Sequence, residues 1–388
     1  MTTERLYYND SYVREFSAEV LEVDGLTAYL DRTAFYPSSG GQPFDIGTLG
    51  GIRVVDVVDE EFRIAHKLEA PIAVGPVTAD IDWNRRFDHM QQHTGQHLLS
   101  SVFEELFAFK TLSFHMGADV STIELGTGAL DPTQVLKAER RANELVAENR
   151  HVTVSYEDAS VAGGLRKASE RQGTLRIVDL DGLDRSACGG THVRNTGEIG
   201  IILIRKLEKV RANIRLEFVC GLRAVQRART DFDALSSVSR VFSCAIDEAP
   251  RIAAAQVEKV QELDKARRTM AAQLAKLEGE ALRSATAAPA SGIRGAVRRG
   301  PISEDTRTLA NAFTAPGKAI LLQLCDDPPS VFLAASKDSG FHCGEVLKKV
   351  LAEAGGRGGG SAVSAQGSVP SREALTLVEE RILAAWPS

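Results

Sequence analysis

The feature that most constrains the fold is a set of potential metal ligands in two segments far apart in the sequence. Cys188 and His192 stand four residues apart around two glycines, in the segment SACGGTHV. His93 and His97 have the same spacing in HTGQH, on a predicted helix where both imidazoles share one face. Zinc prefers four nitrogen or sulfur ligands, often supplied as two close pairs. Together the two pairs predict a His3Cys zinc site, although either pair alone is more often accidental.

The residues alone leave the chemistry of such a site open. Metalloproteases with an HExxH motif use the glutamate beside the first histidine as general base, and Thr94 occupies that position here, which disfavours a protease. Four protein ligands indicate a structural zinc, whereas three ligands and a water indicate a catalytic one. His89 extends the histidine face of the predicted helix by one more turn.

Composition excludes several classes of protein. No apolar run approaches the roughly 20 residues that span a bilayer, and the first ten residues lack a signal-peptide core. Five scattered cysteines argue against a disulfide framework. We therefore expect a cytoplasmic protein without membrane association. The net charge of −6 argues against indiscriminate nucleic-acid binding, but residues 201–230 carry eight Lys or Arg against two Glu, and this basic stretch could meet phosphates.

Hydrophobic periodicity predicts an α+β fold. Alternating runs punctuated by glycine predict a small antiparallel β-barrel over residues 5–80. Apolar positions then follow a helical period from residue 87, and a second helix is expected after the N-cap Asp131. The predicted domains are 1–85, a β-barrel with a glycine motif; 86–245, an α+β zinc-binding domain with an antiparallel sheet; 246–290, a long helical spacer with coiled-coil spacing; and 291–388, an α/β domain.

Four separated motifs give the chain a specific resemblance. TAFYPSSGGQPFDIGTL, RRFDHMQQHTGQHLL and DLDGLDRSACGGTHVRNTGEIGIILIRKLE resemble the editing domain of alanyl-tRNA synthetase and its free-standing relatives, the alanyl-tRNA editing proteins of the AlaX type. The final GGRGGGSAVSAQGS is similar to the DHHA1 domain of the long form, although a glycine run alone is typical of a flexible loop. The resemblance covers essentially the whole chain and preserves the order of the motifs.

The resemblance implies residue roles. The two pairs identified above become the zinc ligands of the family, and no motif position departs from its pattern. Thr33 is expected to contact the misplaced amino acid, and Gln42 is expected to lie close to the ester. His89 and His115 are further pocket candidates, for which a place on the helix surface or behind the site is an equal alternative.

The implied activity is hydrolysis of Ser-tRNA(Ala), together with Gly-tRNA(Ala), to free amino acid and tRNA. A synthetic pocket sized for alanine cannot exclude glycine and rejects serine poorly, so a second site is needed. A pocket that hydrogen-bonds the serine hydroxyl leaves buried polar groups unpaired when alanine enters. The chain begins directly with the predicted barrel, so we expect no aminoacylation activity. The implied partner is mischarged tRNA(Ala), with a homodimer through the helical spacer or the C-terminal domain.

Three alternatives remain open from the sequence. The editing region of threonyl-tRNA synthetase shares the histidine and cysteine layout and removes serine from tRNA(Thr). A zinc-stabilised, non-catalytic tRNA-binding protein would keep the fold without the reaction. A DHH-type phosphodiesterase would need an acidic metal-binding domain, of which Asp88, His89 and Met90 form only a fragment.

Overall fold

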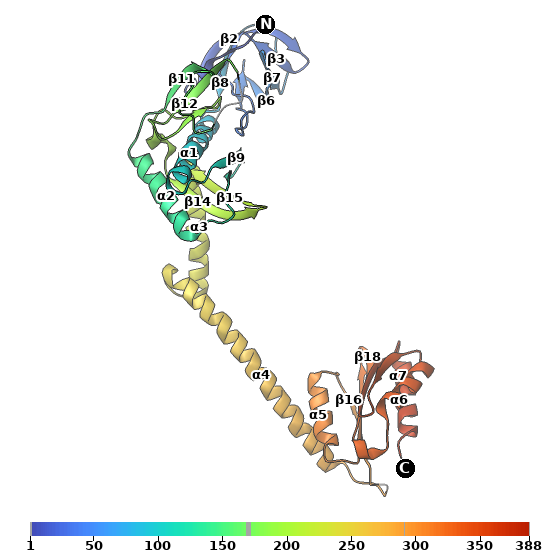
Figure 1. The fold of residues 1–388 in the computed structure, drawn as a ribbon. Coiled ribbons are helices and arrows are strands. Elements are labelled where there is room, and N and C mark those ends of the chain that lie inside the picture. The colour runs from blue at the N-terminus through green and yellow to red at the C-terminus, as the bar shows by residue number, and fades with distance from the viewer. Residues whose placement is uncertain (1, 168–171, 291, 388) are drawn as a thin grey trace. The chain divides into compact units, whose positions relative to one another are not determined.

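The computed structural model describes residues 2–167, 172–290 and 292–387. It divides into two compact units, Met1–Ser237 and Val238–Ser388, with the boundary inside helix α3 (Gly221–Phe242) (Figure 1). Several antiparallel sheets and a 37-residue helix confirm the predicted mixed α+β class. The finer division at residues 85, 245 and 290 stays a prediction.

The first unit begins with a closed antiparallel barrel. Its strands, in order around the barrel, are β2 (Glu15–Asp24), β3 (Thr27–Leu30), β7 (Arg63–Leu68), β6 (Ile52–Glu60), β5 (Gly47–Leu49) and β8 (Gly75–Ile81). Phe16, Ala18 and Val20 alternate inward along β2, as expected for a strand with one buried face. A parallel bridge between β1 (Glu4–Arg5) and β4 (Arg32–Thr33) precedes the loop that carries the glycine motif.

The rest of the first unit is built around helix α1 (Trp83–Phe107), which is buried along most of its length. The helix packs against α2 (Pro132–Ala147) and against one of two antiparallel sheets. The first sheet has the order β14 (Ile202–Val210), β15 (Asn213–Cys220), β10 (Ser121–Leu125), β9 (Thr111–Met116), and the second has β11 (Thr153–Asp158), β12 (Thr174–Asp179), β13 (Arg185–Ala187). Asp131 caps α2 as predicted, with its side chain accepting from the amide of Gln134.

A buried ion pair fastens the glycine-motif loop to α1. Arg86 and Asp45 are both fully buried, and Arg86 Nε donates to Asp45 Oδ2 at 3.0 Å. Arg86 also donates to the carbonyls of Ser11 and Ala34, while the amide of Tyr36 donates to Asp45 Oδ2 at 2.6 Å. This network fixes the loop over the histidine face of the helix.

Replacing Asp45 with alanine is expected to destabilise the protein by about 3–5 kcal/mol, because it leaves the Arg86 guanidinium buried without a counter-charge. Urea denaturation of the full chain measures the loss. The control is Asp264→Ala, which breaks an ion pair with Arg267 on the exposed face of a helix and should not change the transition measurably. Equal transitions for the two variants would contradict the role given to the buried pair.

The second unit is a five-stranded mixed sheet between two helical layers. Its strands run in the order β16 (Arg294–Arg299), β17 (Ala319–Asp326), β18 (Pro329–Ala335), β20 (Ser364–Ser368), β19 (Arg357–Gly360), with only the β16–β17 pair parallel. Helices α4 (Ala249–Ala285) and α5 (Glu304–Thr314) pack on one face, and α6 (Cys343–Glu353) and α7 (Arg372–Ala384) pack on the other. Among the described residues, four short 3-10 helices connect elements along the chain: η1 (Leu6–Tyr8), η2 (Thr196–Ile199), η3 (Ile246–Glu248) and η4 (Lys337–Ser339).

The glycine run near the C-terminus is ordered as strand β19 rather than as a flexible loop. A Cβ atom at Gly360 would lie 2.2 Å from the carbonyl oxygen of Ser364, so the close pairing of β19 with β20 requires glycine there. On α4, the apolar side chains of Met270, Leu274 and Leu277 are exposed. Pairing of two chains through that face stays a prediction.

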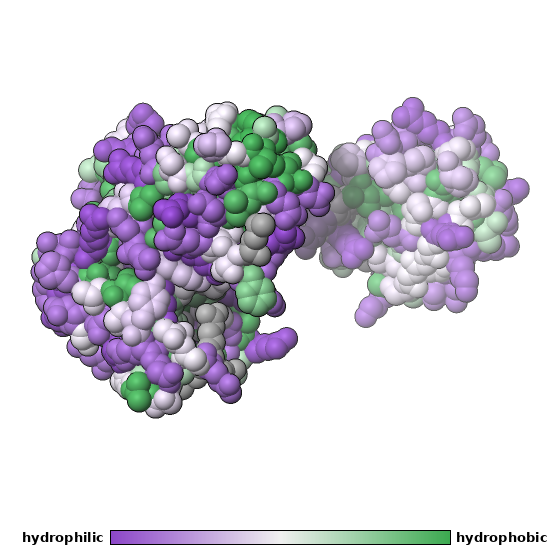
Figure 2. Space-filling view, turned by 90° about the horizontal axis from the view of Figure 1, so that it is seen from above, coloured by the Kyte–Doolittle hydropathy of each residue, from purple (hydrophilic) through white to green (hydrophobic). Residues whose placement is uncertain are grey.

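Within the described ranges, none of the helices combines the length and the apolar character needed to cross a membrane. The face in Figure 2 agrees with this, because hydrophilic residues cover much of it and hydrophobic residues form scattered patches.

Candidate functional site

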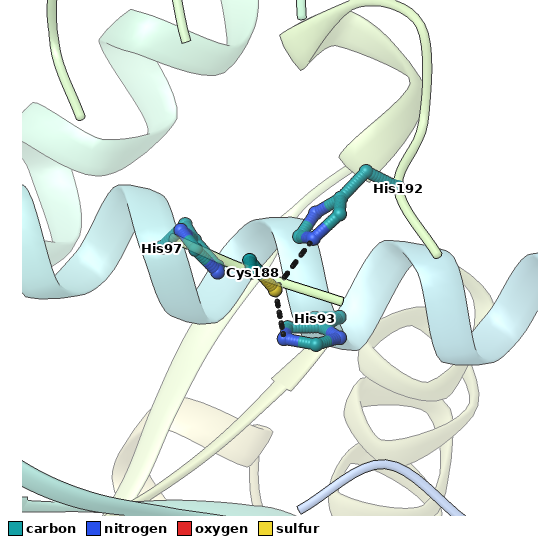
Figure 3. A group of neighbouring side chains, drawn as sticks. All are labelled: His93, His97, Cys188 and His192. Carbon is teal, nitrogen blue, oxygen red and sulfur yellow. Dashed lines mark hydrogen bonds between the residues drawn. The ribbon is translucent and has the colours of Figure 1, made fainter. Parts of the chain in front are cut away.

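The four predicted ligands come together in the first unit. Their ligand atoms all lie within 4.8 Å of one another, so the group could hold a metal ion. His93 and His97 extend from consecutive turns of α1, while Cys188 directly follows β13 and His192 lies further along the same loop (Figure 3). Cys188 Sγ is 3.5 Å from His93 Nε2 and 3.3 Å from His192 Nε2. The three histidines are buried, at 3–4% exposure.

Gln42 orients His93. The amide of Thr191 donates to Gln42 Oε1 at 3.2 Å, and Gln42 Nε2 donates to Thr191 Oγ1 at 2.8 Å, which fixes the side-chain amide. His93 Nδ1 lies 2.8 Å from Gln42 Oε1 and therefore donates to it. The lone pair of His93 Nε2 is then free to face Cys188, as a metal ligand requires.

Asp184 orients His97. The ring donates from Nδ1 to Asp184 Oδ2 at 2.5 Å, and the carboxylate is itself held by Ser186 Oγ at 2.9 Å and by the guanidinium of Arg166. Burial opposes the charge on Asp184, but His97 and Arg166 lower its pKa overall. Although burial alone would lower the pKa of His97, the Asp184 carboxylate raises it. The carboxylate–histidine pair is typical of metal sites.

Thr94 orients His192. Its hydroxyl donates to the carbonyl of Met90 at 2.8 Å, so its oxygen is left to accept from His192 Nδ1 at 3.2 Å. All three histidines thus use Nδ1 for a protein partner and keep Nε2 for the group around Cys188. Burial opposes ionisation of Cys188, but His93 and His192 lower its pKa well below the usual value, which favours the metal-binding thiolate.

Replacing Asp184 with asparagine is expected to weaken metal affinity about 10- to 100-fold, because His97 loses its charged orienting partner. Competition with a chromogenic zinc chelator measures the affinity without reference to any reaction. The control is Asp181→Asn, a change of the same kind in the neighbouring exposed turn. Matching affinities for the two variants would show that Asp184 does not position the ligand.

A cleft of about 620 Å³ opens beside the group, and His93, His97 and Cys188 form part of its wall. Aromatic side chains and glycine backbone form much of the remainder: Tyr7, Tyr8, Tyr36, Phe114, Gly40, Gly189 and Gly190. Arg5 and Arg166 line the cleft but are paired with Asp59 and Asp184, whereas Lys167 is exposed and has no ion pair among the described residues. The arrangement suits a ligand with an aromatic ring and an anionic group.

None of the other predicted pocket residues lines this cleft. Thr33 is fully buried, and its Oγ1 donates to His66 Nε2 at 2.8 Å. The other ring nitrogen of His66, Nδ1, faces the carbonyl of Ala28. Burial lowers the pKa of His66 to about 4, so its ring is neutral and can accept this bond. Gln42 lies behind His93. His115 is exposed on β9, and His89 is buried in the wall of a different pocket.

Sequence reasoning missed the residues that support the four ligands. Asp184 stands four residues before Cys188, and the expectation that a metal-bound histidine has a carboxylate partner is the signal that could have found it. Thr94 was considered only as the absent general base of a protease. Arg176 on β12 had no local signal, yet its Nη1 donates to the carbonyls of Cys188 and Gly190 at 2.7 and 3.0 Å and holds the ligand loop.

The chain is similar to proteins that act in alanyl-tRNA editing and aminoacylation. Residues 175–216 match the family described as "Threonyl and Alanyl tRNA synthetase second additional domain". The chain is 30% identical to "Alanyl-tRNA editing protein AlaX-L" of Pyrococcus horikoshii, over 95% of both chains. It is 31% identical to "Alanyl-tRNA editing protein Aarsd1" of Mus musculus, over 67% of this chain and 68% of the mouse protein. It is also 29% identical to an "Alanine--tRNA ligase" of Pyrococcus abyssi, over 95% of this chain but 42% of the ligase.

The AlaX-L match extends across both compact units, so the relationship is not limited to residues 175–216. The match to the ligase covers 42% of that enzyme, so the similarity does not extend to the rest of the ligase. By the extent of these similarities, the chain belongs to the family of alanyl-tRNA editing proteins.

Proposed function

We propose that the protein hydrolyses the ester bond of Ser-tRNA(Ala), and of Gly-tRNA(Ala), releasing the amino acid and the tRNA. The observation that carries the proposal is the buried His3Cys group in the wall of a cleft, in a chain of the alanyl-tRNA editing family. Exposed cations on β14, on β15 and in the turn between them add a surface for the tRNA. In the described part of the chain these cations form no ion pair: Lys206, Lys209, Arg211 and Arg215.

We assign zinc to His93, His97, Cys188 and His192. The donor set fits, because three neutral imidazole nitrogens and one thiolate are ligands that zinc takes in tetrahedral sites. A bound zinc with these four ligands would join α1 to the Cys188 loop and supply a fixed positive charge beside the cleft.

The chain's own groups can then support ester hydrolysis. A water oxygen bonds to the ester carbonyl carbon, the carbon–oxygen bond to the ribose breaks, and the ribose oxygen takes up the proton. The backbone amides of Gly40 and Gly189 line the cleft, and neither has another acceptor among the described residues, so they are the proposed donors to the oxyanion. The amide of Gly190 is less suited, because it already donates to Cys188 Sγ at 3.4 Å.

Thr33 and Gln42 keep proposed roles in selecting the amino acid, but as positioning residues. Gln42 would act through His93, with which it shares a hydrogen bond, and Thr33 through His66 and the neighbouring loop. Rejection of alanine would follow from buried polar groups that only serine can satisfy.

The second unit completes the proposal. We infer that it is the DHHA1-like part of the chain and that it contacts tRNA, pairs two chains, or does both. Strand β19 exposes the backbone of Gly359, where a Cβ atom would meet nothing within 4 Å. Such an open strand edge can be approached closely by a ligand.

Deacylation of Ser-tRNA(Ala) by the zinc-loaded full chain tests the proposal, with Ala-tRNA(Ala) and Ser-tRNA(Thr) as the comparison substrates. Loss of serine from tRNA(Ala) only is the expected result. Faster loss of serine from tRNA(Thr) than from tRNA(Ala) would support ester hydrolysis but make tRNA(Thr) the substrate. This is a specific alternative because the matching family is described for both threonyl and alanyl tRNA synthetases. If the protein binds tRNA without hydrolysing the ester, it is a tRNA-binding protein and the proposed enzymatic activity is wrong.

A further inference from the structure

A second pocket of about 440 Å³ lies in the first unit, apart from the lining of the cleft. It lies between the first turns of α1, the start of α3 and the turn after β9, and six of its lining residues carry the argument: Asn84, Arg85, Asp88, His89, Arg223 and Gln226. Neither the zinc ligands nor the cleft residues belong to it. Nothing in the proposed hydrolysis uses these side chains.

His89 is the feature that indicates a ligand. The residue is 3% exposed, and its Nδ1 is buried without a hydrogen-bond partner among the described residues. A buried polar atom without a partner costs stability, so each such atom in a native protein requires an explanation. Burial, followed by the charges of Arg85 and Arg223, lowers the pKa of His89 to about 3, and both of these guanidinium groups line the same pocket.

The charges of the pocket leave an unpaired guanidinium. Arg223 Nε donates to Asp88 Oδ1 at 2.7 Å and Nη2 donates to Oδ2 at 2.6 Å, so these two charges compensate each other. Arg85 uses Nε for the carbonyl of Phe44 at 3.0 Å, but within the described ranges its two terminal nitrogens have no acceptor and no carboxylate pairs with it. The side-chain amide of exposed Gln226 is also without a partner there. These donors match the oxygens of an anion.

The start of helix α3 adds further positive potential to this pocket. The helix begins at Gly221, and Leu222 and Arg223 of its first turn line the pocket. The amide of Gly221 donates to the carbonyl of Ile201 at 2.9 Å, but in the described part of the chain no side chain accepts from the amides of Leu222 and Arg223, and no acidic residue lies in this turn. An uncapped helix N-terminus carries partial positive charge and free N–H groups, which favour phosphate.

We propose that this pocket binds a phosphate of the tRNA backbone near the aminoacylated end. His89 precedes His93 by four residues on α1, which is a rise of about 6 Å along the helix. Pro43, in the pocket wall, directly follows Gln42, which bonds His93. A strand whose last nucleotide lies in the cleft can therefore reach the pocket with a neighbouring phosphate. This assignment rests on the proposed function.

Charge changes at Gln226 test the phosphate site with little effect on the fold. Gln226→Glu is expected to lower kcat/KM on Ser-tRNA(Ala) about tenfold and to weaken binding of uncharged tRNA, whereas Gln226→Lys is expected to tighten binding and to steepen its salt dependence by about one phosphate contact. The charge control is Ala147→Glu, which adds the same charge at the exposed end of α2 in the first unit and should behave as the wild type. Fluorescence anisotropy with labelled tRNA measures binding independently of hydrolysis.

Two further substrates separate the possible results. The 3′ seryl ester of adenosine has no phosphate, so Gln226→Glu should affect its hydrolysis much less than that of Ser-tRNA(Ala). Equal losses on both substrates, or equal tRNA binding by the Glu and Lys variants, would overturn the assignment. Inorganic phosphate that binds at millimolar concentration and is lost in Gln226→Glu, with tRNA binding unchanged, would make free phosphate the ligand and also overturn it. If wild-type protein hydrolyses neither ester while the two variants shift tRNA binding in opposite directions, the proposed hydrolysis fails and the phosphate site stands.

Discussion

Replacing Cys188 with alanine is expected to release the metal and to lower deacylation of Ser-tRNA(Ala) by at least about 100-fold, more than the loss of a residue that only orients a ligand. Cys188 supplies the one thiolate of the group and lies within hydrogen-bonding distance of both His93 and His192. Its loss leaves three imidazoles and no negative charge to bind a divalent cation. Metal analysis after dialysis and single-turnover deacylation measure the two effects.

Cys220→Ala is the matched control for this experiment. Cys220 is also buried in the first unit, but burial raises the pKa of its thiol, and it packs in the apolar core beside Gly95. Its removal should cost some stability through a small cavity and leave the metal content unchanged. A Cys188 variant that retains one zinc per chain and full activity would remove the His3Cys group from the mechanism.

Replacing Gly190 with alanine is the second change with a large expected effect. A Cβ atom at Gly190 would lie 2.1 Å from His93 Cε1 and 2.4 Å from His93 Nδ1. The ring cannot yield easily, because its Nδ1 is bound to Gln42 and it stacks on the ring of Phe114. We therefore expect metal affinity to fall at least about 100-fold, with deacylation falling in parallel.

The neighbouring glycine provides the control. A Cβ atom at Gly189 would meet only Tyr8, at 3.7–3.8 Å, which is ordinary van der Waals contact. Gly189→Ala should therefore retain the metal, and zinc titration with a chelator compares the two variants. Loss of metal in Gly189→Ala and retention in Gly190→Ala would show that the loop has a different path around His93.

Local sequence was sufficient to identify several elements and the four side chains that could hold a metal ion. The four-residue spacing of His93 and His97 has one geometric meaning on a helix, and the structure brings both to the Cys188 loop. The cap at Asp131 is equally local, because it depends on a side chain and an amide three residues away. Predictions of this kind depend only on residues that are close in the sequence, so they can be made without knowledge of the fold.

The surroundings of the ligands were decided only by the tertiary structure. The histidine partners Gln42, Asp184 and Thr94 lie 51, 87 and 98 residues from the rings that they orient. No periodicity connects such positions, and the same holds for the glycine run, whose strand pairing depends on β20 and on α6 behind it. The sequence by itself determined which side chains could bind a metal, because ligand chemistry and spacing are local properties. Only the fold decided which nitrogen each histidine presents, because hydrogen bonds between distant segments set the orientation of each ring.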